Sequence, residues 1–431
     1  MNGDIRDRLR RLGVHKGAAD LKPATARGDS PSRRESPHAA SNDQPPVSAP
    51  LWNLEQQTAF GVAYLRRTVY PAQHRHGSWM LQQALDHPQR VLERLNGGAP
   101  VDLRRAVFLD TETTGLAGGA GTLVFLVGLG YFAAGPAGSA EPEIDSFIVD
   151  QYFLHEPAQE AAMLAALDAH LSGRQSLVTF NGRGFDVPLL ETRYTLARIA
   201  PAFSDLTHLD LLLPARRAWR SELGSCSLGS LEFHLLAVRR DQQDIPGFLI
   251  PELYREYLHT REPAGMQRVM YHNLHDILSL VALVTRLGNA VDAPASPGEY
   301  LAAGQYYERH AQWREAEEIY SAALAALGQG NLFQQQRVLH QMAVCLKRQE
   351  RYAQAAPYWR RLAETGDADA WLELAKHYEW REVDLAQALT CSRAALGLCR
   401  EPYARAEVAH RIERLDRKLS LHSQQSQQSQ Q

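Results

Sequence analysis

Between residues 106 and 287, short apolar runs alternate with longer amphipathic segments, and this alternation constrains the fold most strongly. Short apolar runs bounded by turn residues are typical of strands, and apolar residues recurring every three or four positions are typical of helices. The chain order of three strands, a helix, a strand, a helix, a strand and a closing helix predicts an α/β domain whose mixed sheet is flanked by helices. These elements are expected at 106–109, 124–132, 144–153, 158–171, 176–180, from 187 onward, 209–213 and 267–287.

The composition changes on both sides of this domain, for which we predict bounds of 101–292. Residues 1–50 mix Pro, Ser, Ala, Arg and Asp without apolar periodicity, which predicts a disordered N-terminal region. Residues 419–431 form a Ser/Gln segment that is also expected to be disordered. Residues 51–100 are interpreted as a lead-in that packs on the α/β domain. Its stretch 58–76 is rich in aromatics, Arg and His, so holding substrate phosphate is the alternative to packing.

The C-terminal part, residues 298–418, repeats a helix–turn–helix pattern. Trp313-Arg-Glu-Ala316, Tyr352-Ala-Gln-Ala355 and Leu385-Ala-Gln-Ala388 follow one another at offsets of 39 and 33 residues. These offsets lie near the period of about 34 residues that is typical of tetratricopeptide repeats. We therefore predict an all-α, tetratricopeptide-like domain, which would offer a protein partner a concave surface, and an unrelated helical bundle is the alternative.

Charge, cysteines and apolar runs limit the classes of protein to which the chain can belong. The formal net charge of −3 over 431 residues argues against a passive nucleic-acid coat, although a local basic cleft stays compatible with it. The four cysteines form no CxxC pair, which favours a reducing compartment over a disulfide framework. The N-terminus lacks the apolar core of a secretory signal, and the run 123–130 is too short to cross a bilayer. We expect a cytoplasmic protein without a membrane segment.

An Asp-x-Glu pair, Asp110 and Glu112, ends the first predicted strand. Side chains two residues apart on a strand point to the same face, so both carboxylates can converge on one site. Thr113 and Gly115 follow, and supply a hydroxyl and a position where the backbone can approach a substrate closely. Two solvated carboxylates at a strand end are the alternative interpretation.

Two further aspartates lie on later elements. Asp186 follows the turn that begins at Asn181, and could instead be a helix N-cap. Asp276 lies within the apolar closing helix, where a carboxylate is costly unless it is paired or ligated. His272 precedes Asp276 by four residues and therefore shares its helix face.

Four carboxylates from separate elements suit two hard divalent cations. Mg²⁺ takes oxygen ligands, and two such ions can activate a water and stabilise a leaving oxygen on a phosphodiester. A histidine or tyrosine beside the last aspartate would orient or deprotonate that water. The pattern therefore predicts a site for two Mg²⁺ or Mn²⁺ ions that acts on nucleic acid.

Three segments resemble the motifs of the DEDD (DnaQ-like) 3′–5′ exonuclease superfamily, in the order in which they occur there. They are Phe108-Leu-Asp-Thr-Glu-Thr-Thr-Gly115, Phe180-Asn-Gly-Arg-Gly-Phe-Asp186 and His272-Asn-Leu-His-Asp276. Over residues 55 to 410 the chain is similar to the bacterial YprB-like ribonuclease H-like branch, in which tetratricopeptide repeats can follow the nuclease domain. The resemblance implies that Asp110, Glu112, Asp186 and Asp276 are the catalytic, metal-binding acids.

The third motif departs from the superfamily pattern. The superfamily places a tyrosine four residues before the last aspartate, or a histidine five residues before it, whereas this chain has His272 and Tyr271 at those positions. Helical geometry favours His272 as the general base, with Tyr271 and His275 as rivals.

Several functional assignments stay open at the level of sequence. Arg216 could contact substrate phosphates or belong to a solvated helix face, and Thr113, Gly115 and Asn181 are the other expected substrate contacts. A 3′–5′ exonuclease is favoured over two alternatives: a catalytically weak scaffold that recruits partners through its repeats, and an endonuclease of RNA–DNA hybrids. The sequence does not distinguish DNA from RNA.

Overall fold

The computed structural model describes residues 50–115, 121–134, 144–241, 243–327 and 332–428, with backbone only for 332 and 422–428. The predicted disordered region 1–50 lies outside this part of the chain, apart from Pro50. Seven strands form one mixed sheet in the order β1-β2-β7-β6-β5-β8-β9. Neighbours from β1 to β5 pair antiparallel, whereas β5, β8 and β9 are parallel. The strands are β1 (Leu54–Thr58), β2 (Gly61–Pro71), β5 (Ala106–Thr113), β6 (Val124–Ala134), β7 (Ile144–Phe153), β8 (Ser176–Thr179) and β9 (Thr207–Asp210), with a separate pair β3 (Arg75–His76) and β4 (Trp79–Met80).

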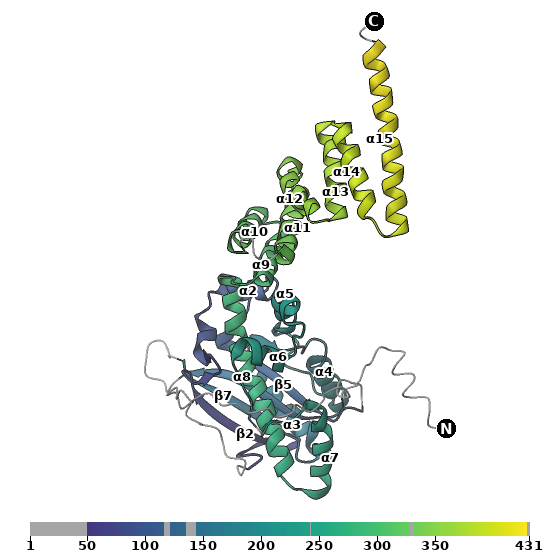
Figure 1. Ribbon diagram of the computed structural model, residues 1–431. Helices are drawn as coiled ribbons and strands as arrows, with labels where there is room; N and C mark the ends of the chain where they lie inside the picture. Colours follow the sequence, from purple (N-terminus) through teal and green to yellow (C-terminus); the bar gives the residue numbers. More distant parts are fainter. Residues whose placement is uncertain (1–49, 116–120, 135–143, 242, 328–331, 429–431) are drawn as a thin grey trace, which may run out of the picture. The chain divides into compact units, whose positions relative to one another are not determined.

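Helices cover both faces of this sheet, as the predicted α/β class requires (Figure 1). On β5, Ala106 and Phe108 pack into one buried cluster, and Val107 and Leu109 pack into the other. This period of two is the reason why Asp110 and Glu112, further along β5, share the face of Phe108. The helices are η1 (Leu81–Asp86), α2 (Gln89–Leu95), η2 (Leu103–Arg105), η3 (Pro157–Gln159), α3 (Glu160–Leu171), α4 (Asp186–Ala197), α5 (Leu212–Leu223), α6 (Leu228–Leu231), η4 (Glu232–Leu236), η5 (Gly247–Leu249), α7 (Ile250–Thr260) and α8 (Ala264–Asp292).

Helix α8 is the closing helix that the sequence predicts, and it begins three residues earlier than expected, at Ala264. Most of its side chains are buried, which explains its apolar composition. By length and composition α8 is the one helix of the described residues that could cross a membrane, and 78% of its most apolar window is buried inside the protein. The core helix of a folded domain passes the same test.

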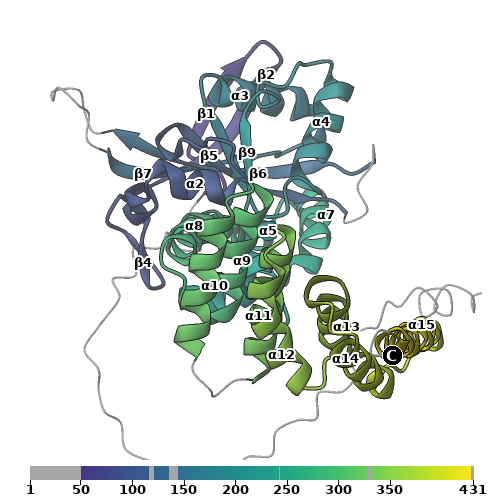
Figure 2. The same ribbon diagram turned by 90° about the horizontal axis from the view of Figure 1, so that it is seen from above.

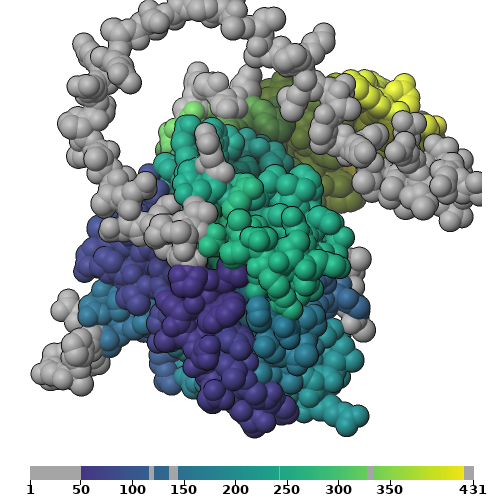
Figure 3. Space-filling model, turned by 90° about the horizontal axis from the view of Figure 1, so that it is seen from below, coloured from purple at the N-terminus to yellow at the C-terminus, as the bar shows by residue number. Residues whose placement is uncertain are grey.

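The segment predicted as a lead-in differs from that expectation, because it supplies strands of the sheet itself. β2 pairs with β7 over eight residue pairs, from Tyr64 opposite Phe153 to Pro71 opposite Ser146. Arg67 forms two hydrogen bonds with the buried Asp150, at 2.7 and 2.6 Å. Figure 3 shows the purple N-terminal strands forming one continuous surface with the later segments of the domain. Arg67 and Arg75, and the aromatic rings of Tyr64 and Tyr70, therefore have structural partners.

The C-terminal region is all helical, and neighbouring helices pack on one another in chain order (Figure 2). The three repeated segments form the first turns of α10, α12 and α14, where Ala316, Ala355 and Ala388 are fully buried. Small side chains at these positions let the helices approach closely. The helices are α9 (Pro297–Arg309), α10 (Trp313–Leu327), α11 (Leu332–Arg348), α12 (Tyr352–Glu364), α13 (Ala368–His377), η6 (Tyr378–Glu382), α14 (Leu385–Leu398) and α15 (Pro402–Gln428).

The prediction of a disordered tail over 419–431 is wrong up to Gln428, where α15 ends. The helix is anchored upstream by the buried Glu379, which accepts hydrogen bonds from Arg411, Arg414 and Lys418. Propagating a helix from an anchored segment is far easier than nucleating one. Residues 429–431 lie outside the described part of the chain.

Helix α9 connects the C-terminal helices to the α/β region through Glu299, whose side chain is only 1% exposed. Its carboxylate accepts hydrogen bonds from the Trp219 indole at 2.8 Å, from the Ala295 amide at 2.8 Å, and from Arg286. Burial alone would raise the pKa of Glu299, but the hydrogen bonds from Ala295 and Trp219 and the charge of Arg286 lower it. Its contribution to stability is therefore present above its ordinary pKa and is lost as the pH falls through the lowered value.

We expect Glu299→Ala to reduce the free energy of unfolding by about 3 kcal/mol at pH 7, because it leaves Arg286 and the indole N–H without their acceptor. Urea unfolding followed by tryptophan fluorescence measures this effect. Glu318→Ala is the matched control, since Glu318 makes an exposed pair with Arg314 on α10. Equal losses in the two variants would contradict the assignment of Glu299 as the anchor of α9.

Candidate active site

Three elements bring the four predicted acids together. Asp110 and Glu112 lie at the end of β5, Asp186 is the first residue of α4, and Asp276 lies on α8. Burial raises the pKa of Asp110 and of Glu112 well above the ordinary range, and the charge of Asp276 raises both further. The charge of Asp186 acts on both groups in the same direction. The charges of Asp186 and Asp276 therefore act on both carboxyl groups of β5.

Asp110 is held by Asn273, one turn before Asp276 on α8. The Asn273 amide donates to Asp110 Oδ2 at 2.8 Å, and its oxygen accepts from the Gln151 amide at 2.9 Å. Gly128 on β6 makes room for this contact, because a Cβ there would lie 2.4 Å from Asn273 Oδ1. Sequence reasoning missed Asn273, although it lies inside the third motif.

Asp186 is buried and accepts a hydrogen bond of 2.5 Å from the Thr111 hydroxyl. The alternative in which Asp186 caps α4 is wrong, because the cap position is Phe185 and Asp186 is the first helical residue. Burial raises the pKa of Asp186 to about 6, although the hydrogen bond from Thr111 lowers it. Thr111 points to the opposite face of β5 from Asp110 and Glu112. The strand therefore carries two of the acids on one face and contacts the third, Asp186, from the other.

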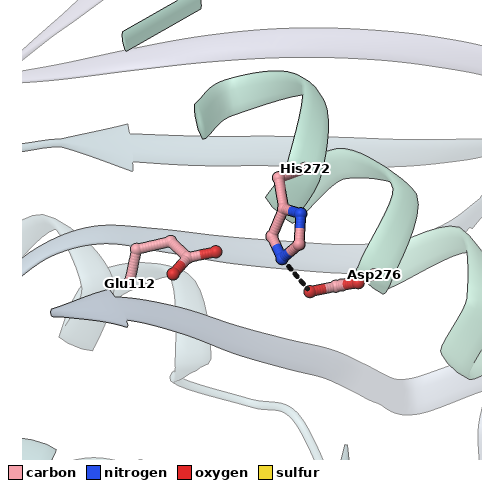
Figure 4. A group of neighbouring side chains, drawn as sticks. All are labelled: Glu112, His272 and Asp276. Carbon is pink, nitrogen blue, oxygen red and sulfur yellow. Dashed lines mark ion pairs between the residues drawn. The ribbon is translucent and has the colours of Figure 1, made fainter. Parts of the chain in front are cut away.

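Glu112, His272 and Asp276 form a group of potential ligands, with donor atoms all within 4.8 Å of one another (Figure 4). His272 Nε2 lies 3.5 Å from Asp276 Oδ2, and His272 Nδ1 lies 2.6 Å from Asp244 Oδ1. Burial lowers the pKa of His272, but the hydrogen bond with Asp244 and the charge of Asp276 raise it above its ordinary value overall. The shared helix face of His272 and Asp276 is confirmed.

Tyr271 and His275, the other candidates for the general base, have different contacts from those of His272. The Tyr271 hydroxyl accepts from the Asp241 amide at 3.5 Å, and the Tyr271 ring packs on the His275 ring with centroids 4.2 Å apart. The His275 ring also lies 5.6 Å from the ring of His76. Burial lowers the pKa of His275 to about 4.

Arg240 is a functional candidate that sequence reasoning missed. Its guanidinium pairs with Asp276 and with the buried Glu232, and it lies 3.2 Å from His272 Nδ1. Glu232 in turn accepts from the Ser279 hydroxyl at 2.6 Å. Burial lowers the pKa of Arg240, but the charges of Asp276 and Glu232 raise it above its ordinary value overall. No motif marks this arginine, because its position depends on the fold of the segment between α6 and α7.

Three of the predicted substrate contacts, Thr113, Gly115 and Asn181, lie in two separate loops. The Thr113 hydroxyl donates to the Gly115 carbonyl at 2.9 Å, so both residues shape the turn after β5. Asn181 has a positive φ of 68°, and its amide donates to Asp210 Oδ1 at 2.8 Å. Asp210, at the end of β9, also accepts from the amide of Arg183 at 3.1 Å and thereby fixes this loop. It is a residue that sequence reasoning missed.

Arg216 is exposed on α5. None of the contacts between described residues brings it to the four acids. The structure thus favours the alternative in which Arg216 belongs to a solvated helix face.

A cavity of about 650 Å³ opens beside His272 and Asp276. Its lining comes from α6, from η4 and the segment after it, from the residues before α7, and from α8. Its lining residues are Leu228, Gly229, Glu232, Phe233, Val238, Arg239, Arg240, Asp244, Ile245, Pro246, Gly247, His272 and Asp276.

Comparison with known proteins agrees with this sheet and site. Residues 107–288 match the ribonuclease H superfamily, so this region is a ribonuclease H-like domain. Over 391 aligned residues the chain is 30% identical to the uncharacterized protein YprB of Bacillus subtilis (strain 168). The aligned region covers 85% of this chain and 91% of that protein. The chain belongs to the same family as YprB. Membership of this nuclease superfamily indicates nucleic-acid cleavage, and such nucleases usually use divalent metals.

The titration of Asp186 gives a direct test of the site. Its raised folded pKa means that its contribution to stability is present below about pH 4 and is lost as the pH rises through about 6. We expect metal-free wild type to lose more thermal stability than Asp186→Asn between pH 4.5 and 7. Mn²⁺ at pH 7 should raise the Tm of wild type by several degrees and that of the variant by less. Identical pH profiles with identical responses to Mn²⁺ would show that Asp186 is not part of a cation site.

Proposed function

We propose that the chain is a divalent-metal-dependent nuclease of the DEDD type, acting as a 3′–5′ exonuclease on DNA or RNA. The observation that carries this proposal is the convergence of four carboxylates from β5, α4 and α8. Burial and the charges of the other acids raise the pKa values of Asp110 and Glu112, so ionising these groups together requires a positive counter-charge beside them. Such a site favours the binding of cations over the binding of anions.

The donor set fits hard divalent cations. Carboxylate oxygens are the ligands that Mg²⁺ and Mn²⁺ prefer. None of the four cysteines, whose thiolates would favour softer metals, belongs to the proposed ligand set. We assign Asp110, Glu112, Asp186 and Asp276 as the ligands of two ions. When bound, such ions supply an activated water and balance the charge on the departing oxygen.

The protein groups around the acids have distinct roles in this proposal. His272 would take the proton of the attacking water at Nε2, because its Nδ1 is engaged by Asp244. Asp244 fixes the orientation of the imidazole ring and stabilises its protonated form. Arg240 pairs with Asp276 and thereby holds this carboxylate on the side of His272.

The cleavage products distinguish the proposed exonuclease from its two alternatives, an endonuclease of RNA–DNA hybrids and a scaffold without activity. A 3′–5′ exonuclease shortens a 5′-labelled oligonucleotide one nucleotide at a time and leaves a circular single strand intact. An endonuclease of RNA–DNA hybrids releases internal fragments, and a scaffold cleaves neither substrate. The presence of all four acids supports an active enzyme over a scaffold.

We further propose that the C-terminal helices form tetratricopeptide-like repeats that bind a protein partner. The buried alanines at the start of α10, α12 and α14 support a repeated packing of helix pairs. A cytoplasmic location is proposed as well, since the four cysteines are free and three of them are buried.

Removing a metal ligand should abolish cleavage. We expect Asp110→Asn and Asp186→Asn to lose more than about 10³-fold in rate with Mn²⁺, whereas the exposed Asp205→Asn serves as the matched control and keeps its activity. Labelled oligonucleotides incubated with Mg²⁺, Mn²⁺ or EDTA and separated on gels measure this loss. Near-normal turnover by either ligand variant, with unchanged metal dependence, would refute the four-acid assignment.

The general base can be identified by comparing three variants. We expect His272→Ala to lower the single-turnover rate by about 10²–10⁴ at saturating Mn²⁺. Tyr271→Phe and His275→Ala should stay within about threefold of wild type, because the Tyr271 hydroxyl accepts from the Asp241 amide and the His275 ring packs near the His76 ring. A silent His272→Ala beside a crippled Tyr271→Phe would reverse the assignment.

A further inference from the structure

The cavity beside the acids has an aromatic and cationic wall that the proposed chemistry does not use. Phe233 and Arg239 form this wall, which we call the Phe233 shelf. Phe233 is 56% exposed, and the Arg239 guanidinium lies 5.1 Å from the centre of its ring. An exposed phenylalanine held beside an arginine offers a flat apolar face and a positive charge together.

The fold of η4 forces Phe233 outward. Its neighbours Glu232 and Leu236 are buried, so the helix is anchored on their side and presents Phe233 to solvent. Glu232 is itself fixed by Arg240 and Ser279. The shelf therefore stands on a rigid support that also carries Arg240 to the acids.

Charge supports an anionic occupant. Arg239 is exposed and, among the described residues, forms no ion pair, whereas the adjacent Arg240 is engaged by Glu232 and Asp276. Asp276 and His272 line the same cavity, so a chain whose phosphodiester lies at the acids can extend over Phe233.

We propose that the Phe233 shelf binds single-stranded nucleic acid, with one unpaired base stacked on the Phe233 ring and a phosphate contacted by Arg239. Base–aromatic stacking tolerates any sequence, because every base has a π-face, and arginine adds a charge-assisted contact. The bases of a duplex are already stacked and paired, so the shelf selects unpaired ends. This inference rests on the proposed nuclease function, and assigns its substrate class.

Binding and cleavage by the full-length chain test the shelf together. Fluorescence anisotropy in EDTA measures the Kd for a labelled single-stranded oligonucleotide, and steady-state cleavage in Mn²⁺ measures KM and kcat. We expect Phe233→Ala to raise Kd and KM about tenfold with kcat changed less than threefold, since stacking acts on binding. Phe233→Trp should restore binding, and Phe233→Leu should not, because leucine keeps the apolar character but lacks the ring.

Two controls separate stacking from a general loss. Phe333→Ala removes an aromatic that is 68% exposed on α11, away from the cavity, and should leave Kd unchanged. With an oligonucleotide that carries abasic sites over its last four positions, wild type should bind as weakly as Phe233→Ala. Circular dichroism melting establishes that each variant is folded.

The outcomes distinguish the two proposals. If wild type cleaves single strands but Phe233→Ala keeps wild-type Kd and KM, the shelf is wrong and the nuclease proposal stands. If Phe233→Ala weakens normal and abasic oligonucleotides equally, the side chain does not stack on a base and the inference fails. If wild type neither binds nor cleaves, the proposed function itself fails.

Discussion

Electrostatic repulsion among four partly enclosed carboxylates is the constraint on which the rest of the structure depends. Asp110 and Glu112 occupy the same face of β5 as the apolar core, so their charges are poorly solvated and their pKa values rise. Arg240 pairs with Asp276 and also with Glu232, so its positive charge is divided between the two carboxylates. When the four acids are ionised, Arg240 balances only part of their negative charge, and the binding of external cations would supply the rest.

A network of hydrogen bonds and ion pairs around Arg240 connects the acids to the buried core. Glu232 pairs with Arg240 and accepts a hydrogen bond from the Ser279 hydroxyl, whose oxygen also lies 2.7 Å from His76 Nε2. His76 belongs to the small β3–β4 pair, outside the region that matches the ribonuclease H superfamily. The N-terminal segment therefore completes the sheet through β2 and supports the site through His76.

Local patterns were sufficient to predict the elements whose role is local. The period of two along β5 and the helical spacing of His272 and Asp276 are properties of neighbouring residues, so the sequence predicts both the carboxylates and the helix face. Arg240 and Asp210 were missed, because each acts through partners distant in sequence that only the folded chain brings near. The same limit applies to β1: a polar edge strand resembles a loop until its partner strand is known. The Ser/Gln composition hid the continuation of α15, which the upstream contacts of Glu379 support.

The central claim is that Asp110, Glu112, Asp186 and Asp276 hold divalent cations between β5, α4 and α8. Anomalous diffraction from crystals soaked in Mn²⁺ tests it most directly. The account predicts two peaks bridged by these carboxylates, with metal–oxygen distances of about 2.0–2.2 Å, and no peaks in crystals of Asp110→Asn soaked in the same way. An absence of peaks at the acids in wild type, with Arg240 still paired to Asp276 at saturating Mn²⁺, would contradict it.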